Sequence, residues 1–76
     1  MEQGREWVPV LDNSTYWSYR DRADNDRVLA NVYRSARGKR WMAWVPSSWT
    51  LEAFKNLQTA AEFAIDQVRV DEETQA

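Results

Sequence analysis

Hydrophobic residues between positions 28 and 45 fall into two runs separated by a polar turn that contains a glycine. The first run reads Val-Leu-Ala-Asn-Val-Tyr and the second reads Trp-Met-Ala-Trp-Val. Runs of β-branched and aromatic residues on both sides of a glycine turn indicate a β-hairpin. We expect a three-residue loop, 36–38, in which Gly38 alone takes the left-handed conformation. A two-residue loop of Arg37 and Gly38 is the alternative, and it requires a positive φ at Arg37.

The three-residue loop predicts which residues of the hairpin share a side. It places Tyr33 opposite Trp41 and Val32 opposite Met42, and side chains alternate along each strand. One side is wholly apolar and is the predicted core side: Val28, Ala30, Val32, Met42 and Trp44. The other side is nearly as apolar: Leu29, Tyr33, Trp41, Ala43 and Val45. Because a half-solvated antiparallel sheet normally has one polar side, we expect the N-terminal segment, a second copy or a partner to cover this second side.

Two shorter segments precede the hairpin. Residues 7–11 form an apolar run that contains Pro9, which has no N–H to donate, so this run is expected at a sheet edge. Residues 15–20 alternate with Trp17 and Tyr19 on one side, which is typical of a strand. Together with the hairpin they predict a three-stranded antiparallel meander with a possible extra N-terminal edge strand.

An apolar stripe with spacings of three and four follows the hairpin and predicts a C-terminal helix over about Thr50–Arg69. The alternative keeps residues 49–54 as a further strand and begins the helix after a cap at Asn56. The fold class is therefore α+β, with the sheet packed on one helix in a single small domain, 1–76. Residues 1–6 and 71–76 are expected to be flexible. The stripe consists of Leu51, Phe54, Leu57, Ala61, Ala64, Ile65 and Val68.

The composition limits the classes of protein that fit. Seventy-six residues provide one small core, and no cysteine is present to add a disulfide. No apolar run approaches the length of a membrane span, and the first residues lack the pattern of a signal peptide. We therefore expect a cytoplasmic protein that does not bind a membrane.

The usual catalytic side chains are scarce. The chain has no histidine, no cysteine and only two glycines, which removes the commonest general base, the commonest thiol nucleophile and any Gly-rich phosphate loop. Asp21, Asp24 and Asp26 lie close together but lack the ligand spacing of a calcium loop. The sequence therefore predicts a protein that is not an enzyme, with no metal, no cofactor and no small-molecule substrate.

Charge is unevenly distributed along the chain. Residues 20–40 hold seven basic and three acidic side chains, whereas residues 50–76 hold two basic and six acidic ones. The basic residues concentrate at the hairpin tip beside two aromatic residues, and Arg, Trp and Tyr are enriched at binding hot spots. The alternative is a solvated turn whose charges protect the edge strands from aggregation. The predicted partner-binding residues are Tyr33, Arg34, Arg37, Lys39, Arg40 and Trp41.

The layout of three strands and a helix also carries a resemblance. The segments Tyr33-Arg34 and Gly38-Lys39-Arg40-Trp41, followed by the alanine-rich helix at Ala60-Ala61, resemble the arm-type DNA-binding domains of phage tyrosine integrases. The layout is also similar to the plant ethylene-response-factor domain. In both families the sheet enters the major groove of DNA. The Trp-x-x-Trp-Val pattern before an alanine-rich helix resembles small phage and prophage proteins, many of which bind a host protein.

Two functions follow as expectations. The first is a non-catalytic protein-binding module, a homodimer or a phage-derived modulator or inhibitor of a host protein, which uses the aromatic sheet side and the basic tip. The second is a nucleic-acid-binding domain that uses the basic hairpin from Arg34 to Arg40. Salt separates the two, because DNA binding through several arginines weakens steeply as ionic strength rises.

Overall fold

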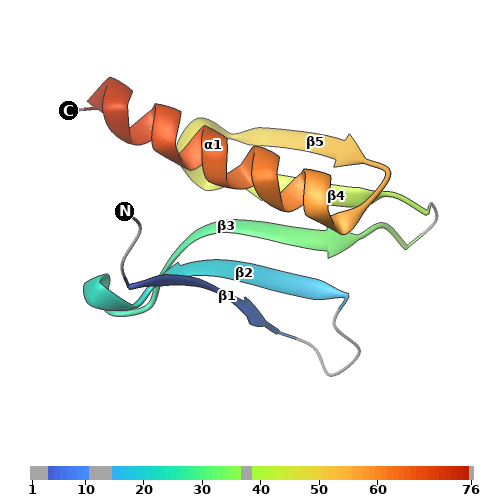
Figure 1. The fold of residues 1–76 in the computed structure, drawn as a ribbon. Helices are drawn as coiled ribbons and strands as arrows, with labels where there is room; N and C mark the ends of the chain where they lie inside the picture. Colours follow the sequence, from blue (N-terminus) through green and yellow to red (C-terminus); the bar gives the residue numbers. More distant parts are fainter. Residues whose placement is uncertain (1–3, 11–14, 37–38, 76) are drawn as a thin grey trace.

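The computed structural model describes residues 4–10, 15–36 and 39–75, and these form a five-stranded antiparallel sheet packed on one side by a C-terminal α-helix (Figure 1). The strands lie in chain order across the sheet. The predicted α+β class is confirmed, but the sheet has five strands where the sequence predicted three. The elements are β1 (Arg5–Pro9), β2 (Tyr16–Asp21), η1 (Arg22–Asp24), β3 (Arg27–Arg34), β4 (Trp41–Val45), η2 (Pro46–Ser48), β5 (Thr50–Phe54) and α1 (Leu57–Gln75).

The first additional strand is β1, which pairs with β2 at one edge of the sheet. Its last residue is Pro9, and an edge position tolerates a residue that cannot donate a backbone hydrogen bond. The N-terminal edge strand that the sequence allowed is thus confirmed, although it begins at Arg5 and not at Trp7.

The second additional strand is β5, which replaces the predicted start of the helix. It pairs with β4 over its whole length, from Trp41 opposite Phe54 to Val45 opposite Thr50. The helix begins only at Leu57, after Asn56, whose side-chain Oδ1 accepts a hydrogen bond of 2.8 Å from the Thr59 N–H. The prediction of a helix from Thr50 was wrong, and the alternative of a strand followed by an Asn56 cap is correct.

The connection between β3 and β4 is longer than predicted. The Ser35 N–H donates to the Arg40 carbonyl at 2.9 Å, so residues 36–39 separate the last hydrogen-bonded pair. The expected Gly38 conformation lies outside the described residues. Val32 lies opposite Ala43, and not opposite Met42 as predicted. A shift of one residue moves every side chain of one strand to the other side of the sheet, so the sides predicted for β4 are reversed.

This reversal changes the core. Ala43 and Val45 are completely buried against the helix, while Met42 and Trp44, predicted for the core, lie on the other side. Val28, also predicted for the core, is 40% exposed. Ala30 and Val32 are buried as predicted. The buried hydrophobic residues are Tyr19, Ala30, Val32, Ala43, Val45, Ala60, Ala64 and Val68.

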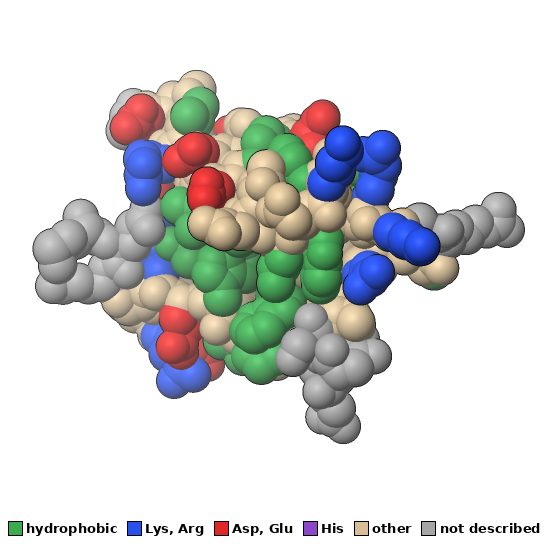
Figure 2. All heavy atoms as spheres, turned by 45° about the vertical axis from the view of Figure 1, so that its right-hand side comes forward, with side chains coloured by type: hydrophobic (Ala, Val, Ile, Leu, Met, Phe, Trp, Pro, Cys, Tyr) green, Lys and Arg blue, Asp and Glu red, His purple; other side chains and the backbone are tan. Residues whose placement is uncertain are grey.

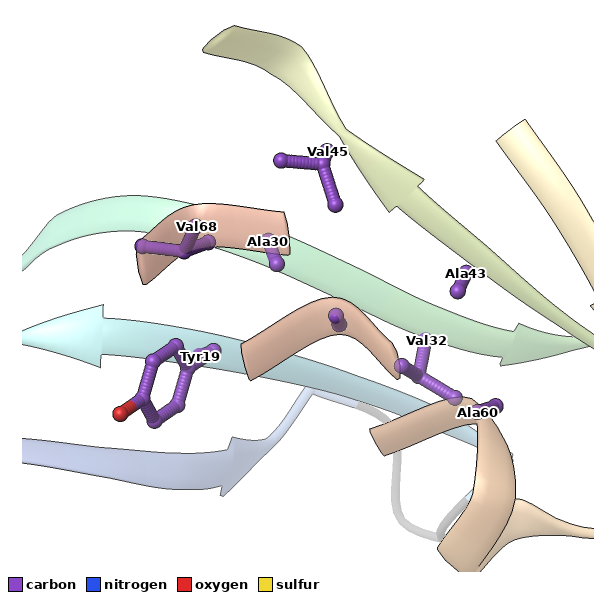
Figure 3. Packing of buried hydrophobic residues seen from close by; sticks show 8 residues of the cluster. Tyr19, Ala30, Val32, Ala43, Val45, Ala60 and Val68 are labelled. Carbon is purple, nitrogen blue, oxygen red and sulfur yellow. The ribbon is translucent and has the colours of Figure 1, made fainter. Parts of the chain in front are cut away.

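Small side chains let the helix lie close to the sheet. Ala60 and Ala64 of α1 are completely buried in one cluster with Ala30, Val32 and Ala43 of the sheet, and Ala60 lies close to Val32 (Figure 3). Tyr19 belongs to the buried core, whereas Trp7, Trp41, Phe54 and Phe63 are only partly buried and pack around it. Phe54 and Phe63, for example, have ring centroids 5.1 Å apart at the β5 margin. The partly buried aromatic side chains therefore cover the margins of a core whose centre is made mostly of alanine and valine.

We predict that Ala64→Leu destabilises the protein by about 1–3 kcal/mol, because the added atoms have no space between helix and sheet. Urea unfolding followed by circular dichroism measures the change. Val70→Leu is the matched control on the same helix. Val70 is 51% exposed, so this control should change stability by no more than about 0.5 kcal/mol. Equal effects of the two variants would contradict the close helix–sheet contact.

We predict that Asn56→Ala lowers the free energy of unfolding by about 1 kcal/mol, because the Thr59 N–H loses its side-chain acceptor. Asn56→Asp keeps an acceptor at the same position and should retain most of the stability. Thermal unfolding of the three proteins tests this pair. Equal stability of Asn56→Ala and wild type would place the helix start elsewhere.

Candidate protein-binding surface

The side of the sheet that faces away from α1 is called the open face here. The strand registers place its central side chains in two rows: the first crosses all five strands, and the second crosses β2 to β5 and ends at Val10, which follows β1. The first row consists of Val8, Ser18, Asn31, Trp44 and Leu51. The second row, nearer the β3–β4 connection, consists of Val10, Tyr16, Tyr33, Met42 and Ala53.

The middle of the open face combines aromatic and polar groups. Tyr16 and Tyr33 stack with ring centroids 5.6 Å apart and planes at 17°. Beside them the buried Ser18 donates its hydroxyl proton to Asn31 Oδ1 at 2.8 Å. Stacking and hydrogen bonding fix these side chains before any partner arrives, which reduces the entropy lost on binding.

Trp49 is the most exposed large hydrophobic residue described, at 83%. It follows η2 with φ 54° and ψ 37°, a left-handed conformation that glycine or asparagine adopts with less strain. Its ring meets the edge of Trp44 on the open face, with centroids 5.4 Å apart and planes at 83°. Trp49 therefore carries backbone strain while burying little of its own surface in the fold.

The structure separates the predicted partner-binding residues. Tyr33 lies on the open face, whereas Trp41 lies on the helix side, opposite Phe54 in the sheet and packed against the core. The prediction that Tyr33 and Trp41 share a side was wrong, because it used the incorrect hairpin register. Arg34 lies opposite Trp41, and its Cζ is 6.0 Å from the centroid of the Trp41 ring.

Basic side chains gather at the end of the molecule that holds the β3–β4 connection and the junction between β5 and α1 (Figures 1 and 2). Lys39, Arg40 and Lys55 are exposed there. None of them makes an ion pair with a residue in the described ranges. Arg37, also predicted for this site, lies outside the described residues. This end therefore presents uncompensated positive charge.

The opposite end holds most of the acidic side chains and is tied together by ion pairs. Arg5 of β1 forms a two-pronged pair with Glu72 of α1, one bond of which measures 2.9 Å, and also contacts Asp21 at 3.5 Å. The bond from Arg5 lowers the pKa of Glu72, and the same bond raises the pKa of Arg5. The Ser47 hydroxyl, 2.5 Å from Asp71, lowers the pKa of that carboxyl. These partners hold the helix beyond the predicted end at Arg69.

Two hollows lie on the helix side of the sheet. One of about 220 Å³ is entirely apolar and is lined by Trp7, Trp17, Leu57 and Ala61. A more polar hollow of about 420 Å³ lies between β3, η2 and the end of α1. The polar hollow is lined in part by Asp71 and Glu72, which are hydrogen-bonded to Ser47 and Arg5. Within the described ranges no cluster of three or more carboxylates has metal-binding geometry, and α1 is too polar to cross a membrane.

The sequence interpretation missed the residues that make the open face hydrophobic on the β4–β5 side. These are Met42, Trp44, Trp49 and Leu51. Met42 and Trp44 were missed because one additional loop residue reversed β4. The sequence did contain a signal that Trp49 lies outside the helix. Pro-Ser-Ser ends the strand before it, and residues 49–54 also fitted a further strand.

Comparison of the chain with models of protein families, with curated proteins and with solved structures finds no match in any of the three.

We predict that Glu72→Gln destabilises the protein at neutral pH and reduces the pH dependence of its stability. The pKa of Glu72 is lower in the folded state than the value of about 4.3 for an unfolded chain. The stability due to this carboxylate is therefore present above about pH 5 and is lost as the pH falls through the folded pKa. Urea midpoints between pH 3 and 7 should thus converge for the two proteins at the acidic limit. Glu73→Gln is the control at an exposed neighbouring position and should match wild type throughout.

Proposed function

We propose that this protein is a non-catalytic protein-binding module and that the open face is its contact surface. The observation that carries the proposal is Trp49, which is 83% exposed and held in a left-handed backbone conformation. Such a residue adds strain and an exposed apolar ring to the isolated fold. Both are accounted for if a partner buries the ring, and tryptophan is among the residues most enriched at binding hot spots.

The remainder of the open face supports the same function. Leu51 lies opposite Trp44 in the neighbouring strand and is 48% exposed. The stacked Tyr16 and Tyr33 add rigid area with hydroxyl groups that can hydrogen-bond a partner. A central apolar patch with a polar surround is the usual composition of a protein interface. By occupying a surface of its partner, a module of this kind modulates or inhibits that partner.

The basic end favours a second candidate function, nucleic-acid binding. Lys39, Arg40 and Lys55 gather there without acidic partners in the described ranges, and Arg34 lies beside Trp41. Charge of this kind contacts phosphates, and a neighbouring aromatic ring can stack on a base. In this case the open face itself would not be needed for binding.

Selection from a random-peptide display library tests the proposed function. The wild-type protein is immobilised at a density too low for two copies to meet. We expect enriched peptides whose binding falls at least about tenfold with Trp49→Ala or Tyr33→Ala, because both substitutions remove hot-spot area. Val70→Ala, an exposed change on α1, is the control and should leave binding unchanged. Peptides that bind all four proteins equally would contradict a contact surface on the open face.

A mobility-shift titration with random-sequence single- and double-stranded DNA tests nucleic-acid binding, the second candidate function. Binding that disappears with rising salt and with Lys39→Ala/Arg40→Ala, but survives Trp49→Ala, would establish the basic end as a nucleic-acid site.

A further inference from the structure

We propose that the open face binds a second copy of this chain, forming a homodimer whose two-fold axis runs across the strands between the two rows. This inference rests on the proposed function, because it assigns a partner to the same surface. The inference follows from which residues of the open face, and which charged ends, meet each other when one copy is rotated about that axis. In this arrangement each strand lies over the same strand of the other copy in the opposite direction, as in aligned sheet packing.

The rotation brings the first row of one copy over the second row of the other. In the β4–β5 half, the large Trp44 lies over Met42 and Leu51 lies over the small Ala53. The large Trp44 and Leu51 side chains thus meet the flexible Met42 side chain and the Ala53 methyl group. Contact between the methionine sulfur and the tryptophan ring is favourable. In the β2–β3 half, the Ser18–Asn31 pair lies under the Tyr33 and Tyr16 hydroxyl groups of the second copy. Polar groups therefore meet polar groups, and apolar groups meet apolar groups.

The same rotation gives Trp49 a partner. Trp49 lies just before β5 and Lys55 lies just after it, at opposite ends of the strand. Reversal of the strand direction places the exposed Trp49 ring over the end of the second copy that carries Lys55 and Arg40. A cation over a tryptophan ring is a favourable contact, and these two cations have no acidic partner in the described ranges.

Long-range charge selects this axis over the alternative. An axis parallel to the strands would place the basic end of one copy against the basic end of the other. The axis across the strands places the basic end over the end at which α1 finishes, where Asp71 and Glu72 lie and where the arginines, Arg5 among them, are paired with carboxylates. Five strands at about 4.8 Å and five residues at about 3.3 Å give each face a footprint of about 400 Å². The two faces together then bury roughly 800 Å², a size that fits a weak, reversible dimer.

Sedimentation velocity over about 5–500 μM protein tests the dimer. We expect reversible dimerisation whose dissociation constant rises at least about tenfold with Ala53→Arg, because the new charge is buried without a partner. Ala53 is exposed, so this substitution leaves the isolated fold intact. Val70→Arg introduces the same side chain on the helix surface and is the matched control, with no change expected. A wild-type monomer at every concentration, or a dimer that Ala53→Arg leaves unchanged, overturns the inference.

An isotope-filtered NOE experiment on a mixture of labelled and unlabelled wild-type protein tests the orientation. We expect intermolecular contacts from the Trp49 indole to the Lys55 side chain and from the Trp44 indole to the Met42 methyl group. Contacts from the Trp49 indole to Glu6 at the start of β1 in the other copy would indicate the parallel axis and overturn the proposed arrangement.

The failure of this inference differs from a failure of the proposed function. A monomer that still captures peptides through Trp49 refutes self-association and retains the protein-binding function. A monomer that captures no peptide through the open face refutes both.

Discussion

The pairing register of β3 and β4 determines which side chains of this sheet lie beneath the helix. With Val32 opposite Ala43, the β4 residues on the helix side are Ala43 and Val45, which are small enough for α1 to approach closely. The same register places Met42 and Trp44 on the side that no helix covers. A thin core and a hydrophobic open face therefore have one cause, and neither can change without the other.

The hydrophobic pattern alone could predict where the strands and the helix lie in the sequence better than it could predict which side of each strand faces the core. The class, the hairpin, the N-terminal edge strand and the Asn56 cap could all be read from local residues. The register could not, because both sides of β4 are apolar: Trp41, Ala43 and Val45 suit a core as well as Met42 and Trp44 do. When alternation does not distinguish the two sides of a strand, the length of the loop decides the register. The connection between Ser35 and Arg40 is one residue longer than predicted, and this reversed the sides assigned to β4.

The same ambiguity explains the error at β5. Leu51 and Phe54 are three residues apart and continue the apolar stripe of the helix, so their spacing fits both elements. Tertiary pairing decides the outcome, because β4 would otherwise expose its backbone donors and acceptors at the sheet edge. The helix then starts at the first residue beyond a good cap. Of the predicted binding residues, Tyr33 lies on the open face, Arg40 lies at the basic end, and Trp41 packs against the core.

The two unusual features of the molecule, its open face and its separated charges, are best understood together. A chain of this size with one helix can bury one side of a five-stranded sheet, and the other side must tolerate water or find a partner. Charged side chains on the open face would make it tolerate water, yet the described charges are concentrated at its two ends. Ends of opposite sign around a neutral apolar centre stabilise one antiparallel arrangement of two identical faces and disfavour the parallel one. In the homodimer that we propose, this separation of charge sets the orientation of contact, and the two rows of the open face supply its area.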